Sequence, residues 1–233
     1  MQNFKDGAVI LINKPYKWTS FDVVKKIRGL LNRHLRFSYD KGETKPKYKI
    51  KIGHAGTLDP LATGLLIICT GKMTKRIEEF MGLEKEYTGK MILGKTTPSH
   101  DMETQVNKTT DISSLTEHQV REATQAFTGK LSQLPPVHSA IKVGGKRAYE
   151  FARQGRDVVL QPREVEVKVF ELMNMHLPEV GFRIICSKGT YIRSIVRDFG
   201  ESLGAGAYLS ELCRTRIGPY LLSDAITIEE VTP

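Results

Sequence analysis

Hydrophobic residues occur in two patterns in the first half of the chain: short apolar runs, which predict strands, and recurrence at helical intervals, which predicts a helix. The apolar runs 8–12 and 65–69 are short and bounded by turn residues, which is typical of buried strands, and residues 87–93 predict another strand. Thr19 and Asp22 have the spacing of a capping box. A helix is predicted after them, because apolar residues recur at helical intervals at Phe21, Val24, Ile27, Leu31 and Leu35.

The second half of the chain contains both helical spacing and the alternation typical of strands. Helical spacing predicts helices over residues 116–127 and 190–203, with a short helix over 148–154 between them. Residues 165–169 and 180–186 alternate apolar and other side chains, which indicates half-exposed antiparallel strands. Because strands and helices do not alternate regularly, a doubly wound parallel sheet fits poorly. We predict an α+β fold built on an antiparallel or mixed sheet flanked by helices.

Composition narrows the class of protein by exclusion. A chain of 233 residues with 40% hydrophobic and 26% charged residues is typical of one large soluble domain with a core. No apolar run is long enough to span a bilayer, and residues 1–6 lack the basic start of a signal peptide. Three cysteines without a CxxC pair favour a reducing compartment and no zinc site. We therefore expect a cytoplasmic protein without metal or membrane. A monomer is our separate expectation, which composition does not derive.

The net charge of +9 points to a polyanionic partner. Residues 25–51 hold most of this excess, since ten basic residues there face only Asp40 and Glu43. Within this segment residues 36–50 predict a basic surface loop, with Phe37, Tyr39 and Tyr48 available to stack on bases. Charge alone leaves two interpretations open: a nucleic-acid contact, or a solvated helix face followed by a loop.

The segment Gly53–Gly64 is the most unusual stretch of the chain, with three glycines, one proline and one acidic residue before a buried strand. Two interpretations stay open for its acid, Asp59. Glycines allow a ligand to approach the backbone closely, and Pro60 favours an extended Asp59. Alternatively, Asp59 caps a short helix with Pro60 at its first position. A phosphate-binding P-loop and a serine nucleophile elbow are excluded, because neither motif is present.

A cation in the first turn of a predicted helix provides the second candidate. If the helix begins near Thr190, Arg193 opposes the helix dipole by roughly 0.3–1 kcal/mol. Arg193 therefore suggests a nearby anion, either a carboxylate or a phosphate, unless it is an exposed arginine that tolerates the small cost. His100, Asp101 and His138 lack metal-ligand spacing and are interpreted as surface or loop residues, and Cys186 as a buried structural thiol.

The block Gly53–Gly64 resembles the TruB family of tRNA pseudouridine synthases. So do four further stretches: Asn13–Pro15, Lys85–Tyr87, Tyr149–Gly155 and Ser187–Arg193. The resemblance implies a bent pseudouridine synthase sheet and an isomerase that converts the T-loop uridine of tRNA, position 55 in conventional numbering, into pseudouridine. It implies no metal, no organic cofactor and the T-arm of tRNA as partner. It also implies that residues 129–159 form an inserted, thumb-like segment that clamps this arm, with Lys142, Lys146 and Arg147 as contacts.

The family's site residues fall on seven positions of this sequence. The resemblance implies a catalytic Asp59 paired with Arg193, and Tyr87 stacked on the target base. It implies that His54 fills the space of a flipped nucleotide, that Tyr191 is a second active-site tyrosine, and that Leu212 lines the pocket. Lys14 matches a motif that packs under the catalytic loop.

The sequence departs from the family at two points. Many members continue into an RNA-binding domain of the PUA type, whereas this sequence stops at Pro233, and residues 36–49 are longer and more basic than expected. We therefore expect a short form, a single catalytic domain over 1–233, in which the basic loop replaces part of the PUA domain. Two other classes stay open: a non-catalytic tRNA-binding module and a nucleoside glycosidase, which would need a second carboxylate.

Overall fold

The structure is a computed structural model of the chain, and it describes residues 4, 6–38, 50–139, 141–152, 154, 156 and 158–231. Where the sequence predicts a single domain, the chain divides into two compact units. Unit 1 holds the residues up to Glu86 and those from Cys213 onward, and unit 2 holds Tyr87–Leu212. The basic loop predicted over 36–50 lies largely outside the described residues.

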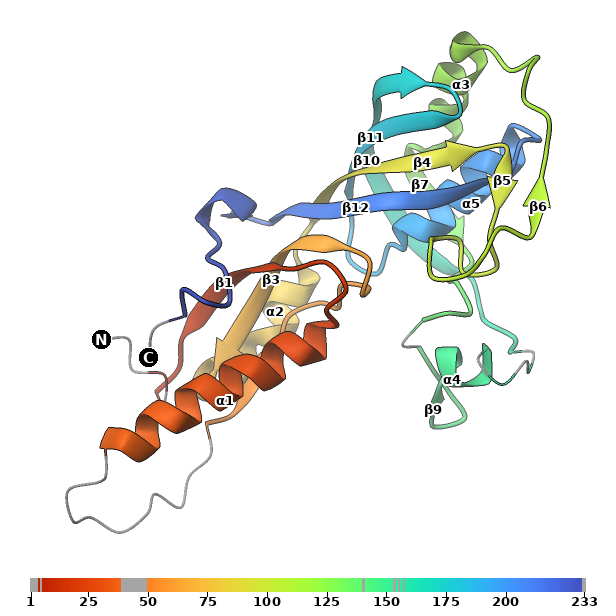
Figure 1. Ribbon diagram of the computed structural model, residues 1–233. Helices are drawn as coiled ribbons and strands as arrows, with labels where there is room; N and C mark the ends of the chain where they lie inside the picture. Colours follow the sequence, from red (N-terminus) through yellow and green to blue (C-terminus); the bar gives the residue numbers. More distant parts are fainter. Residues whose placement is uncertain are drawn as a thin grey trace. The chain divides into compact units, whose positions relative to one another are not determined.

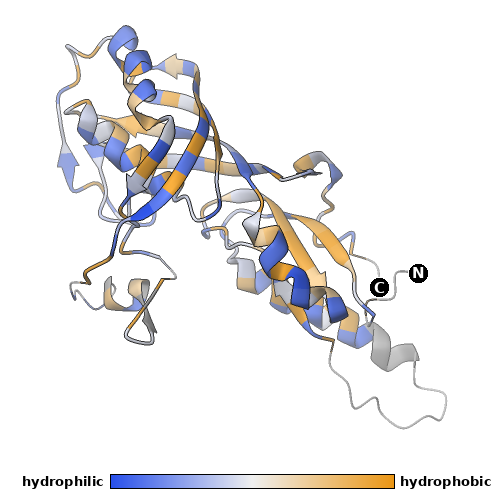
Figure 2. Cartoon of the chain, turned by 180° about the vertical axis from the view of Figure 1, so that it is seen from behind, coloured by the Kyte–Doolittle hydropathy of each residue, from blue (hydrophilic) through white to orange (hydrophobic). Residues whose placement is uncertain are grey.

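Unit 1 is built around a mixed sheet. Its strands are β1 (Val9–Lys14), β2 (Ile52–His54), β3 (Thr63–Thr70), the end of β12 (Ala207–Ile217) and β13 (Tyr220–Leu221). Strand β3 lies at the centre, since it pairs antiparallel with β1 and β2 and parallel with β12. Residues 64–70 of β3 are all buried, so the apolar run 65–69 is confirmed as a core strand. The strands of this unit are coloured hydrophobic along most of their length (Figure 2).

Helices cover both faces of β3. On one face, α1 (Ser20–Ser38) packs Val23, Val24, Ile27 and Leu31 against β1 and β3. On the other face lie the 3-10 helix η1 (Gly71–Arg76) and α2 (Ile77–Gly82), with Phe80 in that core. Figure 1 shows α1 alongside the strands of its unit. This two-sided cover explains why β3 is apolar at successive positions rather than alternating.

The N-terminus of α1 confirms the predicted capping box and corrects two other expectations. The Thr19 amide and hydroxyl donate to Asp22 Oδ2, and the Asp22 amide donates to Thr19 Oγ1. Phe21, predicted on the apolar face, is 60% exposed, because it lies beside the buried stripe rather than in it. The helix also continues to Ser38, so the first residues of the predicted loop are helical.

Unit 2 contains an antiparallel sheet. Its strands are β4 (Lys85–Leu93, in this unit from Tyr87), the start of β12, β11 (Glu179–Cys186), β10 (Arg163–His176) and β7 (Gly129–Gln133). Strands β10 and β11 are antiparallel, as predicted, and Figure 2 shows alternating bands along the strands of this unit. A register shift between Val167 and Val169 moves the buried position to Phe170, because a bulge inserts an extra residue.

Helix α5 (Ile192–Ser202) covers this sheet through Phe199. The Phe199 ring meets Phe170 edge-on at 5.2 Å between centroids and Phe127 at 5.6 Å. Phe127 ends the 3-10 helix η2 (Thr124–Phe127), which follows α3 (Glu117–Ala123). The predicted helix 116–127 is thus an α-helix with a 3-10 end. Between β4 and α3, a small hairpin is formed by β5 (Lys95–Thr96) and β6 (Lys108–Thr109).

The predicted insertion 129–159 begins inside the sheet. Its first five residues form β7, which pairs with β10, so the chain leaves the sheet only at Leu134. The excursion carries a hairpin of β8 (Lys142–Val143) and β9 (Lys146–Arg147), followed by α4 (Ala148–Ala152). Figure 1 shows β9 and α4 extending away from the sheet of their unit.

The predicted fold class is confirmed: helices flank a mixed, mostly antiparallel sheet in an α+β arrangement. Among the described residues, no helix has the length and apolar character needed to cross a bilayer.

Candidate active site

The segment Gly53–Gly64 runs from the end of β2 to the start of β3 in unit 1, and residues 55–62, which include Asp59, link the two strands. The Ala62 amide donates to the Asp59 carbonyl oxygen at 3.1 Å, which closes a β-turn with Pro60 at its second position. No helix follows Asp59, so the alternative of a helix cap is wrong. The Asp59 side chain is half-buried, with its two neighbours in the chain held by other elements. We call residues 53–64 the Asp59 loop.

The start of α1 and the chain before it hold the Asp59 loop on both sides of the carboxylate. Ser20 Oγ accepts from the Leu58 amide at 2.9 Å and donates to the Leu58 carbonyl oxygen at 3.1 Å. The Pro60 carbonyl oxygen accepts from the Lys17 amide at 2.9 Å. These bonds restrict the backbone on both sides of Asp59, and a catalytic carboxylate needs such a fixed base.

Lys14 lies fully buried beneath this loop. Its ammonium donates to the carbonyl oxygens of Pro15 at 3.0 Å, Trp18 at 2.5 Å and Pro60 at 3.4 Å. Burial lowers the pKa of Lys14 to about 8, and the negative charge of Asp59 partly opposes that shift. The expectation that Lys14 packs under the catalytic loop therefore agrees with its contacts.

Arg214 is a second buried cation under the loop, and no pattern in the sequence singles it out. It is 1% exposed, and it donates from Nη2 to the Gly56 carbonyl oxygen at 3.1 Å and from Nε to that of Leu65 at 2.8 Å. A charged residue within a strand is normally predicted to face solvent. Arg214 is buried because β12 pairs with β3 at this position. Gly64, where φ is +102°, leaves room for this backbone approach.

His54 ends β2 at the start of the Asp59 loop, paired with Ile68 of β3. Burial and the positive charge of Arg214 lower the pKa of His54, so its ring is neutral at physiological pH. A neutral, half-buried imidazole offers a flat face that can stack on a base.

In unit 2, Arg193 lies in the first turn of α5, as predicted, and is 3% exposed. Its Nη1 donates to the Ser99 carbonyl oxygen at 3.1 Å and its Nη2 to that of His138 at 2.9 Å. Its Nε lies 3.6 Å from Asp101 Oδ2. The anion predicted near Arg193 is therefore found, and it is a carboxylate. The predicted pairing of Arg193 with Asp59 stays a prediction, because the two residues belong to different units.

Asp101 lies outside the named strands and helices, as a loop residue would, but its interpretation as a surface residue is wrong. Asp101 is 5% exposed, and its Oδ1 accepts from the Glu103 amide at 2.9 Å while Oδ2 faces Arg193. Its neighbour His100 has a left-handed backbone and is half-buried, and burial with the charges of Arg197 and Arg193 lowers its pKa to about 4. Sequence reasoning missed the burial of Asp101, because in a polar turn no sequence pattern distinguishes a buried acid from an exposed one.

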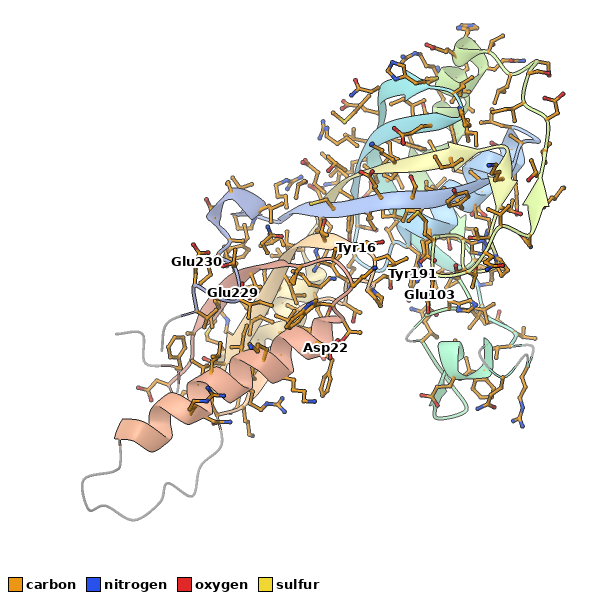
Figure 3. The ribbon with its side chains drawn as sticks, viewed as in Figure 1. Tyr16, Asp22, Glu103, Tyr191, Glu229 and Glu230 are labelled. Atoms are coloured by element: carbon orange, nitrogen blue, oxygen red, sulfur yellow. The ribbon has the colours of Figure 1, made fainter. Side chains whose placement is uncertain are left out.

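The other predicted residues of unit 2 lie on three elements. Tyr191 precedes α5, where its amide donates to Gln133 Oε1 at 2.8 Å and its carbonyl oxygen accepts from Gln133 Nε2 at 3.1 Å. Figure 3 labels Tyr191 at this end of the helix. Tyr87 is 8% exposed on β4, and Leu212 is half-buried on β12. The backbone of Tyr87 is thus held by its strand, and the backbone of Tyr191 by the Gln133 side chain.

Lys142, Lys146 and Arg147 lie on the β8–β9 hairpin. Lys142 pairs with Arg147, so both occupy one register position, while Lys146 pairs with Val143. The turn residues Gly144 and Gly145 both have positive φ, as a two-residue hairpin turn requires. In the part of the chain that the structure describes, no group of three or more His, Cys, Asp or Glu side chains could hold a metal ion.

Two family models match this chain. Residues 43–192 match the family described as TruB family pseudouridylate synthase (N terminal domain), and residues 193–233 match the tRNA pseudouridylate synthase B C-terminal domain. The chain is 51% identical over 227 residues to tRNA pseudouridine synthase B of Phocaeicola vulgatus, which covers 97% of this chain and 92% of that relative. It is 47% identical over 227 residues to the protein of that name from Flavobacterium johnsoniae, with 97% and 95% covered.

Solved structures are similar as well. A Cbf5–Nop10–Gar1 complex contains a chain that matches with a TM-score of 0.70 and 30% identity, over 98% of this chain and 54% of that one. An H/ACA RNP bound to a substrate RNA containing 2′-deoxyuridine matches with a TM-score of 0.67 and 27% identity, over 98% and 53%. This chain spans about half the length of those two.

Proposed function

The chain belongs to the TruB family of pseudouridylate synthases, and from that membership we propose that it isomerises the T-loop uridine of tRNA, position 55, to pseudouridine. As a member of this family the protein is an enzyme of the isomerase class. The proposal of tRNA as substrate is supported by the names of the curated relatives, tRNA pseudouridine synthase B. The observation that carries the catalytic assignment is the Asp59 loop, in which hydrogen bonds from Ser20 and Lys17 hold both neighbours of one carboxylate.

The reaction breaks the bond between ribose C1′ and base N1, turns the base, and joins C1′ to C5, from which a proton leaves. Asp59 is the proposed nucleophile, because an aspartate is a competent covalent partner for an electron-poor carbon. Its target is C1′ or C6; abstraction of the 2′ proton to give a glycal is the other route open to the same carboxylate. Each route needs a carboxylate fixed within bond-forming distance, which the Leu58 and Pro60 contacts favour.

In unit 2, we assign further roles in this reaction to Arg193, Tyr87, Tyr191 and Leu212. Arg193 is held by the Ser99 and His138 carbonyl oxygens. Its proposed role is to keep the catalytic carboxylate ionised. The Tyr87 ring is proposed to give the detached base a flat surface, and its hydroxyl is the proposed relay for the C5 proton. Tyr191 and Leu212 are proposed to line the uridine pocket, where exclusion of water prevents hydrolysis to an abasic nucleotide.

A uridine inside a folded loop reaches Asp59 only when it leaves the stack, so the proposal includes base flipping. Extruding a nucleotide costs a few kcal/mol of stacking. His54 is the proposed replacement in the RNA, since its ring is neutral and flat at the edge of the Asp59 loop. On the β8–β9 hairpin, Lys142, Lys146 and Arg147 are proposed to contact phosphates of the T-arm, which positions the RNA without reading its sequence.

The test is tritium release from uridine-5-³H in a tRNA transcript, with mass-spectrometric mapping of the product. The wild-type chain should form pseudouridine at the T-loop position, and Asp59→Asn should form none while binding the RNA with unchanged affinity. Asp111→Asn is the matched control, because that exposed acid accepts hydrogen bonds from Ser113 within its own turn. Full activity in Asp59→Asn, or product elsewhere in the tRNA, would refute the proposal.

A further inference from the structure

A groove of about 530 Å³ runs along the solvent side of α1 in unit 1. We call it the α1 groove and define it by four basic residues, Lys17, Lys25, Lys26 and Arg33, together with Trp18 and Asp22. We propose that this groove binds the sugar–phosphate backbone of the substrate RNA beside the target uridine. This inference rests on the proposed function and adds a contact surface to it.

The charge of the groove fits a polyanion. Four cations face one carboxylate, and that carboxylate is engaged, because Asp22 Oδ2 accepts from the amide and hydroxyl of Thr19 in the helix cap. Within the described residues, Lys25, Lys26 and Arg33 form no ion pair. Lys25 and Arg33 are eight residues apart, about 12 Å of helix, a length over which a nucleic-acid strand presents several phosphates.

Aromatic side chains at the same end of the helix fit nucleotides rather than free phosphate. Trp18 lines the groove and is partly buried. Tyr16 is 45% exposed and Phe21 60% exposed, and Lys17 Nζ lies 5.6 Å from the centre of the Tyr16 ring. Large exposed aromatic rings beside lysines are the combination on which single-stranded bases stack. A phosphate-binding surface without stacking would not need them.

The groove begins at the Asp59 loop. Lys17 lines the groove, and its amide donates to the carbonyl oxygen of Pro60, the residue after Asp59. Figure 3 shows Tyr16 and Asp22 near the junction of β1 and α1, the segment that carries these bonds. A strand whose uridine reaches Asp59 therefore continues directly onto α1. This continuity commits the groove to substrate RNA rather than to an unrelated partner.

The chain contains one tryptophan, Trp18, so its fluorescence reports the groove alone. The experiment titrates the full chain with a fluorescein-labelled T-arm hairpin, and it measures RNA binding by anisotropy and Trp18 emission in the same sample. Binding should quench Trp18. Over salt concentrations from about 50 to 200 mM, Lys25→Gln/Lys26→Gln should reduce the slope of log K against log salt by about 1.4 and weaken binding about tenfold.

Lys72→Gln/Lys75→Gln is the matched control, since it removes two exposed charges from η1 of the same unit. This control should keep the wild-type slope. An equal loss of slope in both variants would overturn the proposal that the groove binds RNA. So would unchanged Trp18 emission at full RNA occupancy, or wild-type RNA binding by Lys25→Gln/Lys26→Gln. A failure of the proposed function is separate, because it appears as absence of pseudouridine with the wild-type chain.

Discussion

The single hydroxyl of Ser20 satisfies both backbone groups of Leu58, accepting from its amide at 2.9 Å and donating to its carbonyl oxygen at 3.1 Å. Both residues are buried, at 1% and 3% exposed. Water therefore cannot replace this hydroxyl easily. The first residue of α1 thus fixes the position immediately before Asp59, and the geometry of the loop depends on where the helix begins.

Ser20→Ala should lower kcat more than it weakens RNA binding. Removing the hydroxyl leaves the Leu58 amide and carbonyl without a partner, which costs about 1–3 kcal/mol of folding stability. A displaced carboxylate lowers kcat by about 10-fold or more. Single-turnover kinetics and urea unfolding measure the two effects. Ser202→Ala is the control, because its hydroxyl donates only within α5. Equal kcat values for Ser20→Ala and wild type would mean that Ser20 does not position Asp59.

Asp101→Asn should destabilise the chain, although the two side chains have nearly the same shape. Asp101 Oδ1 can still accept from the Glu103 amide, but an amide group then faces Arg193 Nε in place of a carboxylate. Removing one partner of a buried ion pair costs about 3–5 kcal/mol. Urea unfolding checks this loss. The exposed variant Asp111→Asn should change stability by about 0.5 kcal/mol or less, and an equally small effect of Asp101→Asn would show that the pair is weak.

Local patterns predicted the elements of this fold well, since β1, β3, α1 and α5 each follow from apolar spacing and caps. They failed where an extra residue enters a strand: a period-two pattern places Val169 inside, whereas the bulge buries Phe170. They also left Asp59 ambiguous. Proline suits the second position of a turn and the first turn of a helix for the same reason, its fixed φ.

The parts of the site that sequence reasoning missed are partners across the fold. Asp101 and Arg214 are charged residues in unremarkable local sequence, and both are buried by strands or turns distant in the chain. Lys14, by contrast, was selected through the resemblance, and its three carbonyl contacts give that selection a physical basis. A buried charge becomes visible only when the groups that compensate it are placed around it.

Gly64→Ala should unfold or strongly destabilise unit 1. A Cβ at this position would lie 2.4 Å from the Arg214 carbonyl oxygen, and the φ of +102° disfavours any side chain. Overpacking and backbone strain together cost about 3 kcal/mol or more. Gly29→Ala is the matched control, because a Cβ there has nothing within 4 Å and replaces an exposed helix glycine. It should gain about 1 kcal/mol. Similar unfolding midpoints for the two variants would contradict the close approach of β12 to Gly64.

Deprotonation of Lys14 should affect both activity and stability, and the two should change in opposite directions as pH rises. Burial lowers this pKa from 10.5 to about 8. Above pH 8 the neutral amine has too few protons for its three carbonyl acceptors and no charge to face Asp59, so kcat should fall as pH rises through about 8.

Stability should move the other way. Between pH 8 and 10.5 the unfolded chain holds the Lys14 proton that the folded chain has released, so the contribution of Lys14 to the free energy of unfolding rises with pH. Lys14→Met should lower kcat by about 100-fold. Its kcat should not decline near pH 8, and its free energy of unfolding should lack the rise between pH 8 and 10.5 that Lys14 gives the wild type. Paired pH profiles of single-turnover rate and urea unfolding measure both effects. A decline near pH 8 that persists in Lys14→Met would assign it to another group.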